Sequence, residues 1–152
     1  HPVAGSEYVR LAGTKDLFEI QAGNLALQKS DREDIRALAR MIVDDHTRAT
    51  ETLKEATGKT LGFATLPTRV DTTHQAKLQQ LQAAQGAEFD RLYLEMQKHG
   101  HQEALALHRA YATGGDNAAL KVAAREFAST VQKHLEEVER ISGTTSAPPP
   151  RG

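Results

Sequence analysis

Three ionisable residues interrupt an apolar helical stripe in the first half of the chain. Asp44, Asp45 and His46 follow one another directly. His46 falls on the stripe itself, whose members recur at steps of three and four residues, the period of one helix face: Ile35, Leu38, Ile42, His46, Ala49 and Leu53. A histidine at such a core position either makes buried hydrogen bonds with a purely structural role or serves as a metal ligand or proton carrier.

A second histidine repeats this placement near the C-terminus. His134 shares a helix face with four apolar residues at the same steps: Phe127, Val131, Val138 and Ile141. Glu137 follows His134 by three residues and completes the pattern His-x-x-Glu. Imidazole nitrogens and carboxylate oxygens are ligands for transition metals such as zinc, manganese, copper and nickel.

Residues 87–112 carry two competing stripes, and periodicity alone does not choose between them. The first consists of Asp90, Leu94, Gln97, His101, Leu105 and His108. The second consists of Leu92, Met96, His99, Glu103 and Leu107. Only one stripe can face the interior, so either His101 or the pair His99 and Glu103 lies on the surface.

Residues 7–29 place Glu19 one helical turn before Ala22 and Gly23, whose small size allows a neighbouring helix to approach closely. That placement favours an inward-facing carboxylate, and a solvated surface glutamate is the alternative. One candidate ligand then comes from each long helix: Glu19, His46, His101 and His134. Candidates for the groups that support these ligands are Asp45, Asp90, Glu103 and Glu137.

The pattern does not fit a di-iron site. Such a site needs Glu-x-x-His on each of two helices, and this chain has Val43 and Val131 three residues before His46 and His134. A single transition-metal ion such as zinc fits the available residues better. No Gly-rich phosphate loop, nucleophile elbow or Cys/His dyad is present, so we expect binding rather than catalysis.

Five segments have helical character: 7–29, 31–56, 71–84, 87–112 and 117–141. Ser30 with Glu33 matches a capping box, and Asp116 matches a helix N-cap. Short joints predict two antiparallel hairpins, and the long stretch 58–84 predicts a crossover between them. We expect an all-α fold, a ferritin-like four-helix bundle with a short extra helix in the crossover between helices two and three. One domain at 7–141 would precede a disordered, Pro-rich tail at 142–152.

Composition narrows the possible partners. The 152 residues are 39% hydrophobic and 5% aromatic, with 19 basic and 20 acidic residues that alternate along the chain. No basic block could track a phosphate backbone, so nucleic acid is not an expected partner. No apolar run is long enough for a transmembrane helix, and the absence of cysteine excludes thiolate metal sites.

Five segments in a fixed order resemble the DUF4142 family: 18–27, 39–47, 86–94, 101–107 and 134–135. The elements Met-x-x-Asp-Asp-His, which ends at His46, and Phe-Asp-x-x-Tyr, which begins at Phe89, are the most specific of these. The resemblance runs from about Lys15 to Ile141.

The resemblance implies a ferritin-like bundle in a bacterial protein that is exported to the periplasm or cell envelope after removal of a signal sequence. The family pattern singles out Glu19, Asp45, His46, Asp90, His101 and His134. It thereby favours the stripe of Asp90 and His101 over that of His99 and Glu103. The family has no settled activity, so the resemblance says more about fold and location than about function.

Two functional hypotheses follow. In the first, the protein binds a transition metal in a sequestration or stress-related role; in the second, it is a metal-free structural or interaction module whose histidines form buried hydrogen-bond networks. Counting turns along parallel second and third long helices predicts that His46 approaches His101, with Glu19 or His134 as a third group. If His46 and His134 are buried and neutral, burial lowers their pKa values.

Overall fold

The computed structural model describes residues 4–58 and 65–146, and within these ranges it contains five α-helices and no strand. The all-α prediction is therefore confirmed. The helices are α1 (Gly5–Lys29), α2 (Glu33–Gly58), α3 (Thr72–Ala83), α4 (Gly86–Gly114) and α5 (Ala118–Ser146).

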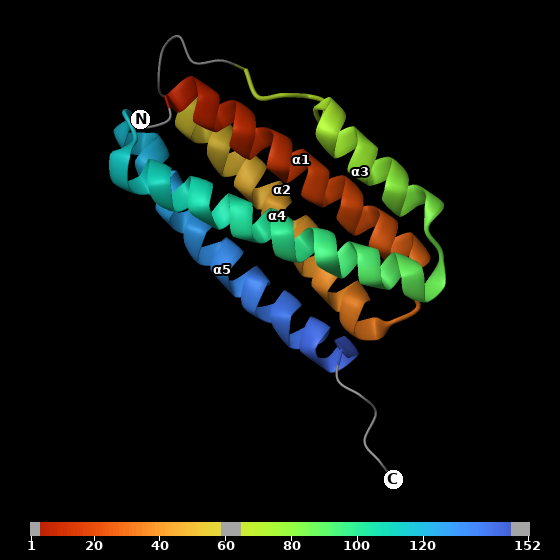
Figure 1. Ribbon diagram of the computed structural model, residues 1–152. Coiled ribbons are helices and arrows are strands. Elements are labelled where there is room, and N and C mark those ends of the chain that lie inside the picture. The colour runs from red at the N-terminus through yellow and green to blue at the C-terminus, as the bar shows by residue number, and fades with distance from the viewer. Residues whose placement is uncertain (1–3, 59–64, 147–152) are drawn as a thin grey trace.

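The four long helices pack in a ring. α1 packs against α2 and α4 against α5, while α2 also contacts α5 and α1 also contacts α4. Figure 1 shows α3 on the outside, next to α1, where it carries the chain back along the length of the molecule. Because of this return, α2 and α4 run in the same direction, as the length of the connection predicted.

Two large apolar cores fill the ends of the ring, a smaller apolar cluster joins α4 to α5, and a polar layer lies between the two large cores. The first core contains Ile35 and Leu38 of α2 with Tyr93 of α4. The second contains Leu53 of α2 and Tyr111 of α4. The residues between these stretches include three buried histidines, so each histidine is held in place by apolar packing above and below it.

The boundaries of α2 and α5 differ from the sequence prediction. The capping box at Ser30 is wrong, because Ser30 ends α1, where its N–H donates to the Ala26 carbonyl at 2.9 Å, and α2 begins three residues later. Asp116 is not the cap of α5 either. Asn117 has that role, since its Oδ1 accepts the Leu120 N–H at 2.9 Å.

Asp116 instead ties the ends of two helices together. Its Oδ1 accepts the Gly5 N–H at 3.0 Å and the Tyr111 hydroxyl at 2.8 Å.

The C-terminal end of α5 lies further along the chain than predicted. The helix continues to Ser146 and includes the first residues of the segment predicted to be a tail. Residues 147–152 of that segment lie outside the described residues. None of the described helices has an apolar stretch long enough to cross a membrane.

Candidate metal centre

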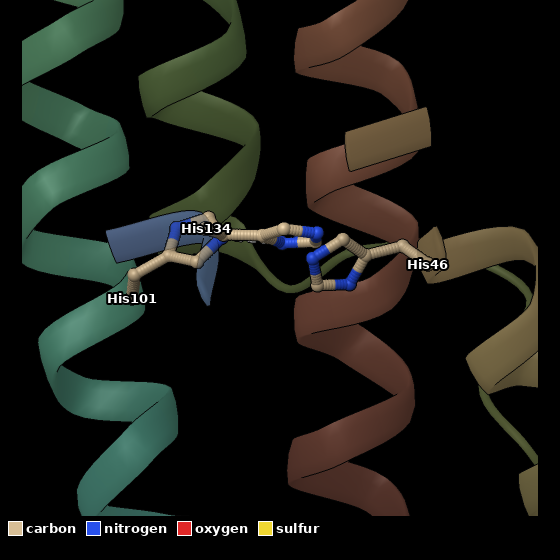
Figure 2. A group of neighbouring side chains, drawn as sticks. All are labelled: His46, His101 and His134. Carbon is tan, nitrogen blue, oxygen red and sulfur yellow. Dashed lines mark hydrogen bonds between the residues drawn. The ribbon is translucent and has the colours of Figure 1, made fainter. Parts of the chain in front are cut away.

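His46, His101 and His134 meet in the polar layer between the two cores. They come from α2, α4 and α5, and Figure 2 shows their rings turned toward one another. The ring centroids lie 5.3 to 5.8 Å apart. One nitrogen from each ring lies within 4.8 Å of one nitrogen in each of the others. The predicted approach of His46 to His101 is confirmed, with His134 as the third group.

The outer nitrogen of each ring faces a hydrogen-bond acceptor. His46 Nδ1 is 2.8 Å from Asp16 Oδ1, and His134 Nε2 is 2.7 Å from Asp45 Oδ2. His101 Nδ1 is 2.8 Å from the backbone carbonyl of Gln97. Carbonyl and carboxylate oxygens only accept, so these three nitrogens carry the protons. In a neutral ring the second nitrogen then presents a lone pair, which is how proteins orient histidine ligands toward a metal.

The inner nitrogens lack suitable partners. His101 Nε2 and His134 Nδ1 lie 3.3 Å apart, and both present lone pairs when the rings are neutral. His46 Nε2 is fully buried, with no hydrogen-bond partner among the described residues. Facing lone pairs repel one another unless a proton or a cation lies between them. The geometry therefore fits a positively charged ion at the centre of the three rings.

The three histidines differ in their protonation behaviour. Burial lowers the pKa of His101 well below its ordinary value, and it also lowers that of His134, where the hydrogen bond to Asp45 opposes it. For His46, burial is outweighed by the hydrogen bond and charge of Asp16, so the pKa is raised. The expected lowering is thus found for His134 and is wrong for His46. The reason is an aspartate on another helix.

Glu19 lies beside this cluster, on the outer side of His101. Its Oε2 is 3.8 Å from His101 Nδ1, and its Oε1 is buried without a partner among the described residues. A Cβ at Gly100 would lie 3.3 Å from Glu19 Oε2, so the glycine leaves room for the carboxylate. Burial raises the pKa of Glu19 to about 7. The inward-facing Glu19 of the sequence analysis is confirmed, but its oxygens are not among the atoms that meet within 4.8 Å.

One of the four residues predicted to support the ligands contacts a histidine of the cluster. Asp45 contacts His134 directly, whereas Asp90, Glu103 and Glu137 form no hydrogen bond or ion pair with the three histidines among the described residues. Asp90 is buried on α4 about three turns, roughly 16 Å, before His101. Glu103 is exposed and lies 3.6 Å from Lys15, and Glu137 pairs with Arg140. Glu103 follows His101 by two residues, which places it on a different face of α4.

The structure adds one residue that the sequence analysis missed and decides between the two stripes of residues 87–112. Asp16 was missed, although it precedes Glu19 by three residues and so shares its face of α1. On α4 the stripe of His101 is buried and His99 is exposed, which is the choice that the family resemblance favoured.

Comparisons with known proteins agree with the helical fold. A solved structure described as "CopM in the Cu(II)-bound form" matches the chain with a TM-score of 0.80, covering 95% of this chain and 99% of that one. At 17% sequence identity, this similarity shows the fold alone. A comparison with curated proteins finds no match. The family model described as "Domain of unknown function (DUF4142)" matches residues 3–141, so the resemblance is confirmed and the chain belongs to the DUF4142 family.

Proposed function

We propose that this protein binds one transition-metal ion through the inner nitrogens of His46, His101 and His134. The observation that carries the proposal is the arrangement of these rings, with three outer N–H groups held by acceptors and three inner nitrogens within 4.8 Å. A site of this kind supplies tight binding, so the role we propose is sequestration of the ion in a stress-related context.

The surrounding charges support a cation. The Asp16 and Asp45 carboxylates contact the outer nitrogens of His46 and His134, and the Glu19 carboxyl lies 3.8 Å from His101. Hydrogen bonds of this type make a histidine a stronger ligand, and nearby negative charge offsets the cost of burying an ion.

Copper(II) is the first ion to test. Copper(II) binds more tightly than zinc to a given set of nitrogen ligands, and the solved structure with the similar fold is described as Cu(II)-bound. Zinc, which the sequence analysis named as its example, also accepts imidazole ligands and is the second choice.

We also propose a domain organisation and a cellular location for the protein. We infer a single domain at residues 7–141 with the wiring of a ferritin-like four-helix bundle, in which α3 is the crossover helix. The family resemblance implies an exported protein of the periplasm or cell envelope. Fractionation of cells that express the native gene tests the location, and recovery only in the cytoplasmic fraction would contradict it.

The metal proposal is tested with protein purified without a histidine tag. We expect one Cu(II) per chain by native mass spectrometry, with an affinity measurable by chelator competition. His101→Ala should lower that affinity at least about 100-fold, because it removes one of three ligands. His99→Ala is the matched control, since His99 lies two residues away on the exposed face of α4.

Two results would overturn this proposal. One is a wild-type protein that binds no ion more tightly than the His101→Ala variant does. The other is an equal loss of affinity in His99→Ala. Either result would favour the alternative, in which the Asp16–His46 and Asp45–His134 pairs form a metal-free network that fixes how the helices pack.

A further inference from the structure

A cavity of about 210 Å³ lies between α2 and α5 and reaches the histidine cluster. Its walls include Ala49 from α2 and Thr130 from α5, and Asp16, Asp45 and His46 also line it. The cavity thus contacts one of the three histidines and the aspartate that holds a second one. A water molecule occupies about 30 Å³ of liquid, so several waters or one small molecule can fit.

The cluster is most accessible from this side. His46 is 7% exposed, whereas His101 and His134 are each 1% exposed. A second hollow, between α1 and α4, also contacts His46 and His101, but its volume is about 20 Å³. That is room for about one water, whereas the cavity between α2 and α5 has room for several, so the latter is the wider route.

The rim of the cavity carries more acidic than basic groups. Asp45 and Glu126 contribute carboxylates from its two walls, and Arg48 contributes one guanidinium, which pairs with Asp45. The Arg48 side chain is 73% exposed, so it can swing away from the opening at little cost. Carboxylates at the mouth of a recess raise the local concentration of cations.

The ligand set is incomplete on its own. Among the described residues, only three side chains form a group with ligand atoms within 4.8 Å of one another. Three histidines leave one position of a four-coordinate ion for an exogenous ligand. The cavity is the space from which such a ligand would reach the ion.

We propose that the cavity between α2 and α5 is the route by which the ion reaches the three histidines, and that it admits a small monodentate donor, such as water or a small anion, to the bound ion. This inference rests on the proposed metal binding and adds to it a direction of access and an open coordination position.

Filling the cavity tests the route. Ala49→Phe places a ring in it, and Ala37→Phe is the matched control because Ala37 is an exposed alanine on the same helix. In stopped-flow mixing with Cu(II), we expect Ala49→Phe to slow uptake at least about tenfold while one ion per chain is still bound at equilibrium. Ala37→Phe should match the wild type. Thr130→Phe fills the cavity from the opposite wall and should slow uptake likewise, so the test survives if Ala49→Phe does not fold.

Azide tests the open position. Added to the copper-loaded wild type and to Ala37→Phe, azide should produce a new charge-transfer absorption band, and in Ala49→Phe and Thr130→Phe that band should be absent or much weaker. Unchanged uptake rates in both filled variants, or an azide band of equal strength in all four proteins, would overturn the inference. Failure of the wild type to bind copper would instead overturn the proposed function, so the two failures are distinguishable.

Discussion

The two sides of the histidine cluster satisfy their polar groups in opposite ways. On the paired side, Asp16 bonds to His46 and Asp45 bonds to His134. On the unpaired side, Glu19 Oε1 and the Tyr93 hydroxyl are buried without partners among the described residues. Glu19 is close enough to Tyr93 for its charge to raise the pKa of the phenol, in addition to the larger effect of burial.

The paired groups orient the histidine rings, whereas the unpaired groups lower the stability of the fold. Each buried polar group without a partner costs about 1–3 kcal/mol, so the unpaired side weakens the fold. The paired side fixes the orientation of two histidine rings, whose inner nitrogens lie within 4.8 Å of each other. Natural proteins violate packing rules mainly where function requires it, and the violations here adjoin the proposed metal site.

The largest expected effect comes from breaking the paired side. Asp16→Ala leaves His46 Nδ1 buried without its acceptor, and removal of one partner of a buried pair costs about 3–5 kcal/mol. Urea unfolding of the metal-free protein measures this cost, and NMR titration should show that the pKa of His46 falls. Asp44→Ala, at an exposed position on α2, is the control and should change stability by less than about 0.5 kcal/mol. Equal effects of the two substitutions would show that the Asp16–His46 pair does not hold the histidine.

The next largest effect is the pH dependence of stability that the buried Glu19 carboxyl causes. Burial raises the pKa of Glu19 from 4.5 to about 7, so between these values the folded chain holds a proton that the unfolded chain has lost. The free energy of unfolding therefore falls as pH rises through this window, by on the order of 3 kcal/mol from this group alone.

Glu19→Gln removes that dependence. The stability difference between Glu19→Gln and the metal-free wild type should be small at pH 4.5 and should grow in favour of the variant up to about pH 7. Glu103→Gln is the control because Glu103 is exposed on α4. A difference that stays constant over this range would mean that Glu19 is solvated or fully paired.

The same comparison explains what could be predicted from the sequence. A period of 3.6 residues identifies the inner face of a helix, which is why His46 and His134 were selected correctly. It does not give the rotation of one helix against another, so the contact between Asp16 and His46 could not be foreseen. For α4, two faces had equal periodicity, and only the family pattern separated His101 from His99.

Local motifs were less reliable than periodicity. Ser30 and Asp116 both match capping patterns, yet Ser30 Oγ accepts the Arg32 N–H and Asp116 Oδ1 accepts from Gly5 and Tyr111, so neither caps the helix that follows it. The acceptor for His101 is a backbone carbonyl, that of Gln97, and any residue type could supply it. Side-chain patterns therefore predicted which histidines are buried, while most of the contacts that hold them depend on tertiary packing.

The smallest expected effect on stability concerns two buried tyrosines. The hydroxyl of one has a hydrogen-bond partner and that of the other has none among the described residues. The Tyr8 hydroxyl lies 2.7 Å from His108 Nδ1, while the Tyr93 hydroxyl has no partner among the described residues. Both side chains are fully buried, so substitution by phenylalanine changes the same amount of packing in each.

Tyr8→Phe should cost about 1–2 kcal/mol, because it leaves His108 Nδ1 buried without its donor. Tyr93→Phe should be neutral or stabilising by up to about 1 kcal/mol, since it removes a hydroxyl that has lost its bonds to water on folding. Chemical denaturation of the two metal-free variants at one pH measures both. If Tyr93→Phe costs as much as Tyr8→Phe, the hydroxyl is hydrogen-bonded in solution and the two sides of the cluster are equally satisfied. If Tyr93→Phe is stabilising, that polar group is retained despite its cost, as expected next to a functional site.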